Sequence, residues 1–394
     1  MFLHENPAPF RSGRCPLAVL LGFFLFFGAG ASAFGAPSVE EMAGQMLLVG
    51  FKGQEPEACG AILEDIRVRH LGGVILFKRD AHNPLIGRNI RDAAQVKRLT
   101  SALREAAPAD RPLFVAVDQE GGKVARFLPR DGFPAFPSAA ELGRGTPEAT
   151  RNTAFRMGTL LRDLGVNLNF APVLDVNAYP DSPAIGRLGR SFSADPKAVS
   201  AHGAAFADGL NAAGVVAVFK HFPGHGSAHT DSHKGVTDIT ATWSPKELEA
   251  YAKPLASSGP HMVMTGHLFH RGLDPDAPAT LSPKVVNGLL RGRGYDGVVV
   301  TDDLQMQAIA ARYSLEEVVL RAIDAGVDIL LIGNNLEYDP AAVARVEAVI
   351  VRAVAEGRLS RARLEASWAR IMKLKGALRE PEGKERHASG GRGA

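Results

Sequence analysis

A regular alternation of short apolar segments with segments of helical spacing is the feature that most constrains the fold. Most of the short runs are apolar at consecutive positions, which is typical of strands covered on both faces of a parallel sheet. Eight strands are predicted on this basis, at residues 46–51, 73–77, 112–117, 167–176, 215–219, 262–265, 297–301 and 328–332. Helices are predicted between and after them, at residues 60–69, 92–106, 150–164, 197–213, 245–255, 284–290, 315–325, 340–356 and 361–374.

Eight alternating strand and helix units predict a closed (β/α)8 barrel of the TIM type, formed by residues 38–378 as a single domain. The alternative is an open, doubly wound α/β sheet. No Gly-x-Gly-x-x-Gly motif follows a predicted strand, which disfavours the dinucleotide-binding form of that sheet. In a barrel, the chemistry is expected at the carboxyl ends of the strands.

The first 33 residues have the three parts of an export signal. Arg11 and Arg14 precede the apolar run 17–28, and small residues follow it as far as Ala33. Cleavage is predicted after Ala33, which makes the mature protein periplasmic or secreted. The alternative is an uncleaved membrane tether, because the apolar stretch approaches the length that spans a bilayer.

The charge of the chain argues against one class of partner. Lys and Arg number 45 against 42 Asp and Glu, so the formal net charge is only +3, and the basic residues are scattered. A nucleic-acid groove needs a concentrated basic face, so no nucleic-acid partner is expected. Residues 379–394 are charged, rich in glycine and poor in apolar side chains, which predicts a disordered tail.

Ionisable side chains come at the end of, or directly after, five of the predicted strands. The side chains are Asp118 and Glu120, Asp175, Lys220 and His221, His267, and the pair Asp302 and Asp303. A purely structural barrel has no reason to place such groups at strand ends repeatedly, and these are the ends that meet around one mouth. The alternative is a set of unrelated, solvated loop charges. The pattern favours an active site.

The segment 220–233 contains a histidine at every fourth position. These histidines are His221, His225, His229 and His233. On a helix this spacing would indicate a metal site. Pro223, Gly224 and Gly226 interrupt any helix here, so a flexible loop over a pocket is predicted instead, and no metal or other cofactor is expected.

Within this segment, Asp231 lies two residues before His233. A carboxylate at that spacing can hydrogen-bond the imidazole, fix its tautomer and keep it suited to acid/base work. The pair Asp302 and Asp303 supplies a candidate nucleophile. Because successive side chains alternate in direction along a strand, only one of the two is expected to point into the pocket. A nucleophile and a proton donor on either side of one bond are what glycoside cleavage requires.

Two motifs resemble those of a known family. KHFPGHG at residues 220–226, followed by Asp231-Ser232-His233, and TDDLQM at residues 301–306 are similar to signatures of the single-domain β-N-acetylhexosaminidases of glycoside hydrolase family 3. The resemblance extends from about residue 42 to residue 374. The other branch of that family, the β-glucosidase type, has a second sandwich domain for which this chain has no room.

The resemblance implies a retaining reaction in two steps. Asp302 would attack the anomeric carbon and form a glycosyl-enzyme intermediate. His233, oriented by Asp231, would protonate the departing oxygen and then activate water. Asp303 is expected to be structural, with the role of nucleophile as its alternative.

The resemblance also implies a set of side chains that hydrogen-bond the sugar hydroxyls. They are Asp118, Arg126, Lys220 and His221. An arginine before a Ser-Phe pair belongs to the same set, but the sequence IGRLGRSF at 185–192 offers both Arg187 and Arg190. Arg190 is preferred because it directly precedes Ser191. For Asp118 and Lys220, the alternative is a salt bridge inside the barrel mouth.

These observations lead to one functional hypothesis with two alternatives. The hypothesis is an exported, monomeric exo-β-N-acetylglucosaminidase that acts on peptidoglycan fragments or chitooligosaccharides. A histidine proton donor suits a leaving group that carries a negative charge, such as the lactate of a muramyl sugar. The alternatives are a catalytically silent sugar-binding or cell-wall scaffold barrel, and a metal-dependent hydrolase that uses the histidine segment.

Overall fold

The structure is a computed structural model that describes residues 36–232 and 235–378. The chain divides after Ala36, and the fold described here is that of the part from Pro37 onward. The predicted export signal, the predicted tail and His233 lie outside the described residues. Among the helices that are described, none combines the length and the apolar character needed to cross a membrane.

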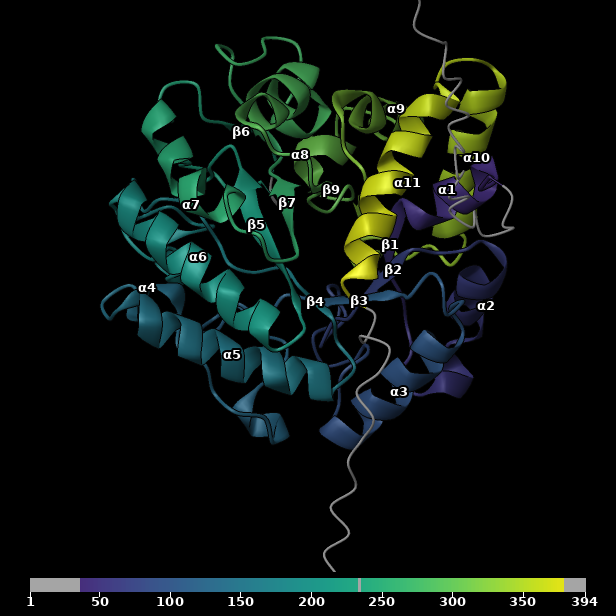
Figure 1. Ribbon diagram of the computed structural model, residues 1–394, viewed down its shortest axis with the longest axis horizontal. Coiled ribbons are helices and arrows are strands. Elements are labelled where there is room, and N and C mark those ends of the chain that lie inside the picture. The colour runs from purple at the N-terminus through teal and green to yellow at the C-terminus, as the bar shows by residue number, and fades with distance from the viewer. Residues whose placement is uncertain (1–35, 233–234, 379–394) are drawn as a thin grey trace, which may run out of the picture. The chain divides into compact units, whose positions relative to one another are not determined.

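Eight parallel strands form one sheet that closes into a barrel (Figure 1). They are β1 (Leu47–Gly50), β2 (Gly73–Ile75), β3 (Phe114–Val117), β4 (Leu168–Asn169), β5 (Val216–Phe222), β7 (His261–Thr265), β9 (Val298–Thr301) and β10 (Leu330–Ile332). Leu47 pairs with Leu330, so the last strand lies beside the first. The circle closes between β9 and β10, where Val300 bridges Ile329 and the Thr301 N–H donates to the Ile329 carbonyl at 3.0 Å. The predicted (β/α)8 barrel is confirmed, and the open sheet is wrong.

The helices alternate with these strands along the chain. They are α1 (Val39–Gln45), α2 (Gly60–Val68), α3 (Ala93–Glu105), α4 (Ala139–Leu142), α5 (Pro147–Asp163), α6 (Pro196–Ala212), α7 (Ala252–Leu255), α8 (Gln307–Ala310), α9 (Leu315–Ala325), α10 (Ala342–Ala355) and α11 (Arg361–Gly376). Most predicted helices lie within one turn of these bounds. The predicted helix 245–255 is instead a 3₁₀-helix, Pro245–Tyr251, that continues into α7, and 284–290 is a π-helix, Lys284–Leu290. Two strands outside the barrel, β6 (Thr237–Asp238) and β8 (Leu268–Phe269), pair with each other.

Polar caps determine where several of these helices begin. The Asp92 side chain accepts from the Gln95 N–H at the start of α3. Thr146 caps α5 in the same way, and Asp195 caps α6. Proline follows both of these caps at the first helical position, where no N–H is needed.

Two strands differ from their predicted lengths. Pairing over the predicted strand 167–176 is regular only in β4, because Pro172 has no N–H to donate to a ladder. A single bridge from Val173 to Lys220 resumes the pairing. The predicted strand 215–219 continues instead to Phe222, so Lys220 and His221 belong to β5 rather than to the loop after it. Both side chains are therefore fixed by the sheet.

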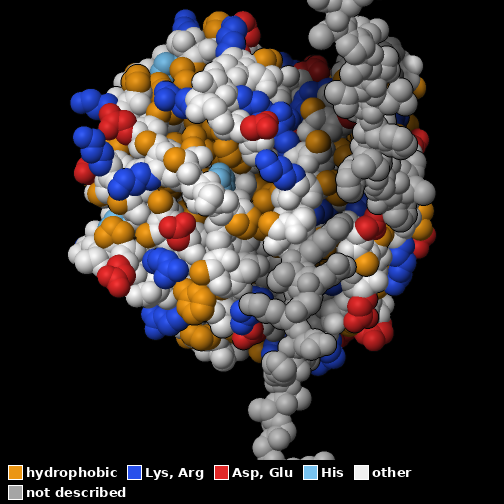
Figure 2. Space-filling model, in the orientation of Figure 1, with side chains coloured by type: hydrophobic (Ala, Val, Ile, Leu, Met, Phe, Trp, Pro, Cys, Tyr) orange, Lys and Arg blue, Asp and Glu red, His pale blue; other side chains and the backbone are white. Residues whose placement is uncertain are grey.

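The surface on the face shown in Figure 2 carries acidic and basic side chains that are interspersed. No continuous basic area appears on the part of that face formed by described residues. The expectation that the protein has no nucleic-acid partner stays a prediction, which this face does not contradict.

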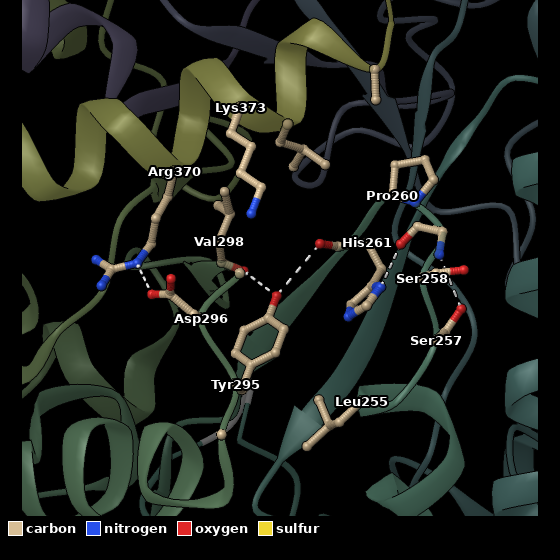
Figure 3. Close-up of a pocket in the computed structure, with 15 residues that line it drawn as sticks. Leu255, Ser257, Ser258, Pro260, His261, Tyr295, Asp296, Val298, Arg370 and Lys373 are labelled. Carbon is tan, nitrogen blue, oxygen red and sulfur yellow. Dashed lines mark hydrogen bonds and ion pairs between the residues drawn. The ribbon is translucent and has the colours of Figure 1, made fainter. Parts of the chain in front are cut away.

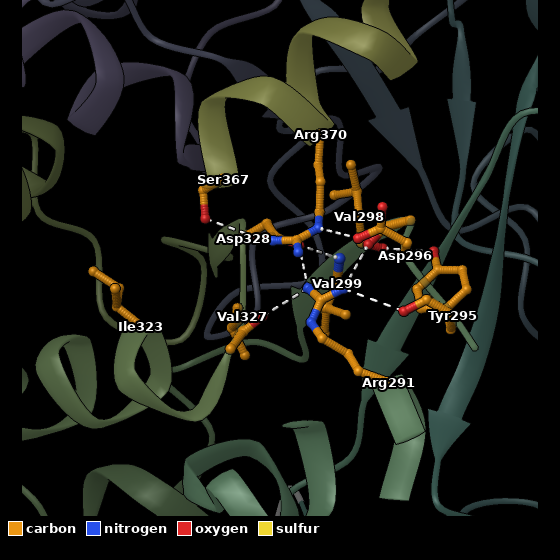
Figure 4. Close-up of polar contacts among 12 residues, drawn as sticks. Arg291, Tyr295, Asp296, Val298, Val299, Ile323, Val327, Asp328, Ser367 and Arg370 are labelled. Carbon is orange, nitrogen blue, oxygen red and sulfur yellow. Dashed lines mark hydrogen bonds and ion pairs between the residues drawn. The ribbon is translucent and has the colours of Figure 1, made fainter. Parts of the chain in front are cut away.

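A buried aspartate joins elements at the amino-terminal end of the barrel (Figure 4). Asp328 is fully buried and accepts from Arg291 Nη2 and Ser367 Oγ, both at 2.8 Å, and from the Val299 N–H at 3.0 Å. Arg363 and Arg370 of α11 approach it at 3.4 Å. One carboxylate thus connects α11 to the strands that close the barrel.

Removing this carboxylate should destabilise the fold strongly. Asp328→Ala leaves three partly buried guanidinium groups without their shared partner, and we expect the free energy of unfolding to fall by about 3–5 kcal/mol. Asp296→Ala is the matched control, because it removes another partner of Arg370 whose side chain is 83% exposed. The control should change the stability by less than about 0.5 kcal/mol. Denaturant unfolding measures both, and equal losses would contradict the role given to Asp328.

Candidate active site

Most of the predicted site residues line one cavity at the carboxyl ends of the strands. Its volume is about 270 Å³. Six predicted residues line it, namely Asp118, Arg126, Arg190, Lys220, His221 and Asp302. They come from five separate parts of the chain, which the closed barrel brings to one mouth. The strand-end pattern therefore located a real convergence of polar groups.

Alternating charges connect the residues on one wall of this cavity. Lys220 Nζ lies 3.0 Å from Asp118 Oδ1 and 2.8 Å from Glu120 Oε1. Arg190 holds the same Glu120 carboxylate with Nε and Nη2, each at 2.8 Å. Arg126 Nη2 donates to Asp118 Oδ2 at 3.0 Å. Asp118 and Lys220 therefore form the salt bridge named as their alternative, and they do so while lining the cavity.

Opposite charges keep this wall ionised despite its burial. Burial alone would raise the pKa of Glu120, but the adjacent Arg190 and Lys220 lower it to about 2. Burial would likewise lower the pKa of Lys220, yet Glu120 and Asp118 raise it. Glu120 was not among the predicted site residues. Its position two residues after Asp118 was the available signal, because alternate residues of an extended segment share a face.

His221 is oriented by a buried carboxylate. Its Nδ1 lies 2.7 Å from Asp175 Oδ2, and its own backbone N–H donates to Asp175 Oδ1 at 3.2 Å. Burial would raise the pKa of Asp175, but His221 lowers it, so the carboxylate accepts the Nδ1 hydrogen. The other ring nitrogen, Nε2, then lies 3.5 Å from Arg190 Nη2 at the cavity. Asp175, noted in the sequence only as a strand-end acid, is thus the support for His221.

Asp302 and Asp303 both contribute to the cavity lining. Because β9 ends at Thr301, the alternation of a strand does not fix the directions of these two side chains, and the expectation that only one faces the pocket stays a prediction. Asp302 is held by its N–H, which donates to the Thr265 carbonyl at 3.0 Å, and its Oδ1 accepts from the Asp303 N–H at 2.8 Å. Asp303 Oδ1 in turn accepts from the Gly333 N–H at 2.8 Å. Asp303 thus ties this segment to the end of β10.

Arg190, rather than Arg187, reaches the cavity. The Arg190 side chain is 12% exposed, whereas that of Arg187 is 65% exposed and lies 3.7 Å from Asp181. Gly189, between them, adopts a left-handed conformation with φ of 67°. The left-handed turn thus separates the two arginines, and the preference for Arg190 agrees with the lining of the cavity.

The predicted acid/base pair is only partly described. Asp231 lines a separate surface hollow together with His229, and His233 lies outside the described residues. The segment nevertheless approaches the nucleophile region, because the Ser232 carbonyl accepts from the Ala308 N–H of α8 at 3.3 Å. The pairing of Asp231 with His233 stays a prediction.

The histidines of this segment point to different partners. His221 binds Asp175, His225 Nε2 lies 3.2 Å from Ser232 Oγ, and the His229 ring lies 4.2 Å from the ring of Tyr179. Among the described residues, no group of three or more His, Cys, Asp or Glu side chains is arranged to hold a metal ion.

Comparison with known proteins identifies the family. The description "Glycosyl hydrolase family 3 N terminal domain" matches residues 38–374. The chain belongs to glycosyl hydrolase family 3. It is 34% identical to β-hexosaminidase A of Pseudoalteromonas piscicida over 86% of this chain and 61% of that protein. It is 41% identical to the β-hexosaminidase LpqI of Mycobacterium tuberculosis, over 67% of this chain and 68% of the relative.

Solved structures agree with this assignment. A family 3 β-N-acetylglucosaminidase from Paenibacillus is 35% identical with a TM-score of 0.79, over 87% of this chain and 63% of that one. A β-N-acetylhexosaminidase from Beutenbergia cavernae is 34% identical with a TM-score of 0.75, over 86% and 99%. This family 3 chain therefore spans less than two thirds of the Pseudoalteromonas and Paenibacillus proteins.

A larger hollow lies at the opposite end of this family 3 barrel (Figure 3). It measures about 380 Å³ and is lined by His261 at the start of β7 and by Tyr295. The Tyr295 hydroxyl donates to the Val298 carbonyl at 2.8 Å, and His261 Nδ1 donates to the Gly259 carbonyl at 2.8 Å. These polar groups are used within the protein, at the end of a barrel that serves stability. The smaller cavity is the candidate active site.

The charge of Glu120 should make stability depend on pH at the acid end. Because its folded-state pKa is lowered from 4.5 to about 2, the stabilisation is present above pH 4.5 and is lost as the pH falls toward 2. Glu120→Gln should lower the free energy of unfolding by about 3–5 kcal/mol at pH 7, and the gap should shrink toward pH 2. Denaturant unfolding at pH 7, 4 and 2.5 measures it. Glu57→Gln, at an exposed position, is the control, and a gap for Glu120→Gln that is independent of pH would contradict the interpretation.

Proposed function

We propose that this family 3 protein is a retaining exo-β-N-acetylglucosaminidase that removes terminal N-acetylglucosamine from glycan chains. The observation that carries the proposal is the single cavity shared by Asp302 and the five predicted sugar contacts. A cavity of only about 270 Å³ suits the end of a glycan better than its middle. The names of the relatives, β-hexosaminidase and β-N-acetylglucosaminidase, support the same reaction.

In the first step, the Asp302 carboxylate bonds to the anomeric carbon while the glycosidic C–O bond breaks and the departing oxygen takes a proton. His233, paired with Asp231, is the proposed donor of that proton. In the second step, water adds to the anomeric carbon, the histidine takes its proton, and the Asp302 carboxylate leaves. The configuration is retained because both steps invert it.

The charged wall supplies binding and orientation. Asp118 accepts from sugar hydroxyls, and Lys220, Arg126 and Arg190 donate to them. These groups are already held by one another at 2.8–3.0 Å, so little reorganisation accompanies binding. His221, with Nδ1 bound to Asp175, offers Nε2 to the same space.

Substitution of the two proposed catalytic groups tests the reaction. With a chromogenic β-N-acetylglucosaminide, Asp302→Ala should lower kcat by about 10⁴-fold or more, because the covalent step is lost. His233→Ala should lose about 10²–10⁴-fold with a poor leaving group and much less with an activated one, which departs without a proton.

The same experiment tests Asp303 as the alternative nucleophile, and it tests the alternative of a catalytically silent sugar-binding barrel. Near-normal turnover in Asp302→Ala, together with inactivity of Asp303→Ala, would transfer the role to Asp303. Binding of N-acetylglucosamine without turnover by the wild type would favour the sugar-binding barrel. Activity that survives a chelator, with no metal found by elemental analysis, would eliminate the metal-dependent hydrolase.

A second, outer cavity favours a negatively charged leaving group. It measures about 670 Å³ and shares Phe77, Arg126 and Asp303 with the inner one. Five cationic side chains line it, against the carboxylates of Asp80 and Asp303. Among the described residues, the exposed guanidinium groups of Arg79 and Arg130 have no carboxylate partner. We propose that this cavity receives a leaving sugar with a carboxylate, such as the muramyl unit of peptidoglycan fragments.

This preference can be measured as a ratio. The kcat/KM for N-acetylglucosamine linked to a muramyl sugar, divided by that for neutral chitobiose, should fall about three- to tenfold when Arg79 and Arg130 are both changed to Ala. High salt should reduce the wild-type ratio. Arg104→Ala, which changes an exposed residue of α3, is the control and should not change the ratio. A wild-type ratio near one would remove the anionic preference while leaving the hexosaminidase proposal standing.

The place of action stays a prediction. It depends on residues 1–33, which lie outside the described residues, as does the question of a cleaved or uncleaved signal.

A further inference from the structure

A buried carboxyl group that the proposed reaction does not use lies behind the sugar-binding wall. Glu247 belongs to the 3₁₀-helix Pro245–Tyr251 and is 3% exposed. Its Oε1 accepts from the Ser244 N–H at 3.4 Å, as part of a capping box. Its Oε2 is buried and has no hydrogen-bond partner among the described residues. A carboxyl group so placed is expensive to ionise.

The segment after β5 rests directly on this carboxyl group. Gly224 has φ of 133°, and a Cβ atom added to it would lie 2.8 Å from Glu247 Oε2. The Ser227 hydroxyl faces the same carboxyl without completing a well-formed hydrogen bond. Beside Glu247, Trp243 Nε1 donates to the Pro223 carbonyl at 3.2 Å. The side chains of Glu247 and Trp243 thus support residues 223–227.

The supported segment in turn positions the sugar-binding histidine. The His225 backbone N–H donates to Asp175 Oδ1 at 2.7 Å. The other oxygen of that carboxylate binds His221 Nδ1 at 2.7 Å. On its far side, His225 Nε2 lies 3.2 Å from Ser232 Oγ. A shift of Gly224 would therefore be transmitted to both His221 and the residues next to His233.

We propose that Glu247 is a positioning residue: its protonated carboxyl group supports Gly224 and Ser227, and thereby keeps Asp175 and His221 in the arrangement that binds sugar. The inference rests on the proposed function only in taking His221 as a sugar contact. If Glu247 were ionised, its buried negative charge would lie close to that of Asp175. The carboxyl group would then support Gly224 and Ser227 less well.

The surroundings of Glu247 determine in which direction its pKa is shifted. Burial raises the pKa of Glu247 to about 7, with Asp175 acting in the same direction and the Ser227 hydroxyl against it. The other titratable groups nearby are the buried Tyr251 phenol on the same helix, whose pKa is also raised by burial, and His225, whose pKa burial lowers to about 4. Neither changes charge near pH 7. The arrangement is favoured below this pH and loses its support as the pH rises through about 7.

The kinetic test uses a β-N-acetylglucosaminide with an activated leaving group, for which kcat/KM does not need a proton donor. In the wild type, kcat/KM should fall by about fivefold or more between pH 6 and pH 8.5. Glu247→Gln keeps the shape without the charge, and its kcat/KM should change by less than about twofold over that range. Glu249→Gln, an exposed change on the same helix, should behave as the wild type.

An independent readout needs no turnover. The chain has two tryptophans, Trp243 and Trp368, so Trp368→Phe leaves Trp243 as the sole emitter. Its fluorescence should shift with a midpoint near pH 7 as its contact with Pro223 loosens, and the shift should vanish when Glu247→Gln is added.

The outcomes separate the two proposals. An alkaline loss of the same size in Glu247→Gln and in the wild type overturns the role of Glu247, as does a flat wild-type profile. If no substrate is hydrolysed, the proposed function fails and the fluorescence decides alone: a shift that depends on Glu247 supports the positioning role, and its absence overturns it.

Discussion

Hydrogen bonds between β9 and the residues directly before β10 close the sheet, and the grouping of the site residues depends on that closure. The Thr301 N–H donates to the Ile329 carbonyl, and the Asp328 N–H donates to the Val299 carbonyl at 2.8 Å. Closure turns eight strands that are far apart in sequence into a ring whose carboxyl ends face one space. Asp118, Lys220 and Asp302 meet there because each follows or ends a strand of this ring. An open sheet would spread them along an edge.

Ionised groups can lie together in the barrel mouth only if the charge of each is balanced by an opposite charge beside it. Glu120 is shared by Lys220 and Arg190, and Lys220 is shared in turn by Asp118. Removing a single member leaves a buried charge without its partner, so the wall is stable only as a unit. A unit of this kind also has fixed donors and acceptors before any sugar arrives. The same contacts therefore serve stability and binding, which is why salt bridge and sugar contact are not competing descriptions of Asp118.

The sequence predicted the features that depend on local pattern and on strand ends. Continuous apolar runs located the strands, and the ionisable residues at the ends of five of them located the cavity. It noted Glu120 only as a strand-end acid, without a role in the site. It did not predict the buried position of Glu247, because KELEAY reads as an ordinary exposed helix until the segment after β5 covers it. Alternation could not establish the directions of Asp302 and Asp303, because both follow the last residue of β9 and alternation holds only within a strand. The preference for Arg190 over Arg187, made because Arg190 directly precedes Ser191, agrees with the cavity lining, although the left-handed Gly189 between them was not predicted.

Four titratable groups at or behind the cavity wall are of two kinds, and the division determines which of the four can respond to pH near neutrality. Glu120 and Lys220 are held in their charged forms by opposite charges at 2.8–3.0 Å, so neither changes state near neutrality. Glu247 and His225 lie one layer behind, where burial favours their neutral forms. Of these two, only Glu247 has a pKa close to neutrality. A change in the charge of Glu247 near pH 7 therefore reaches the wall through the support of residues 223–227, while Glu120 and Lys220 keep their charges.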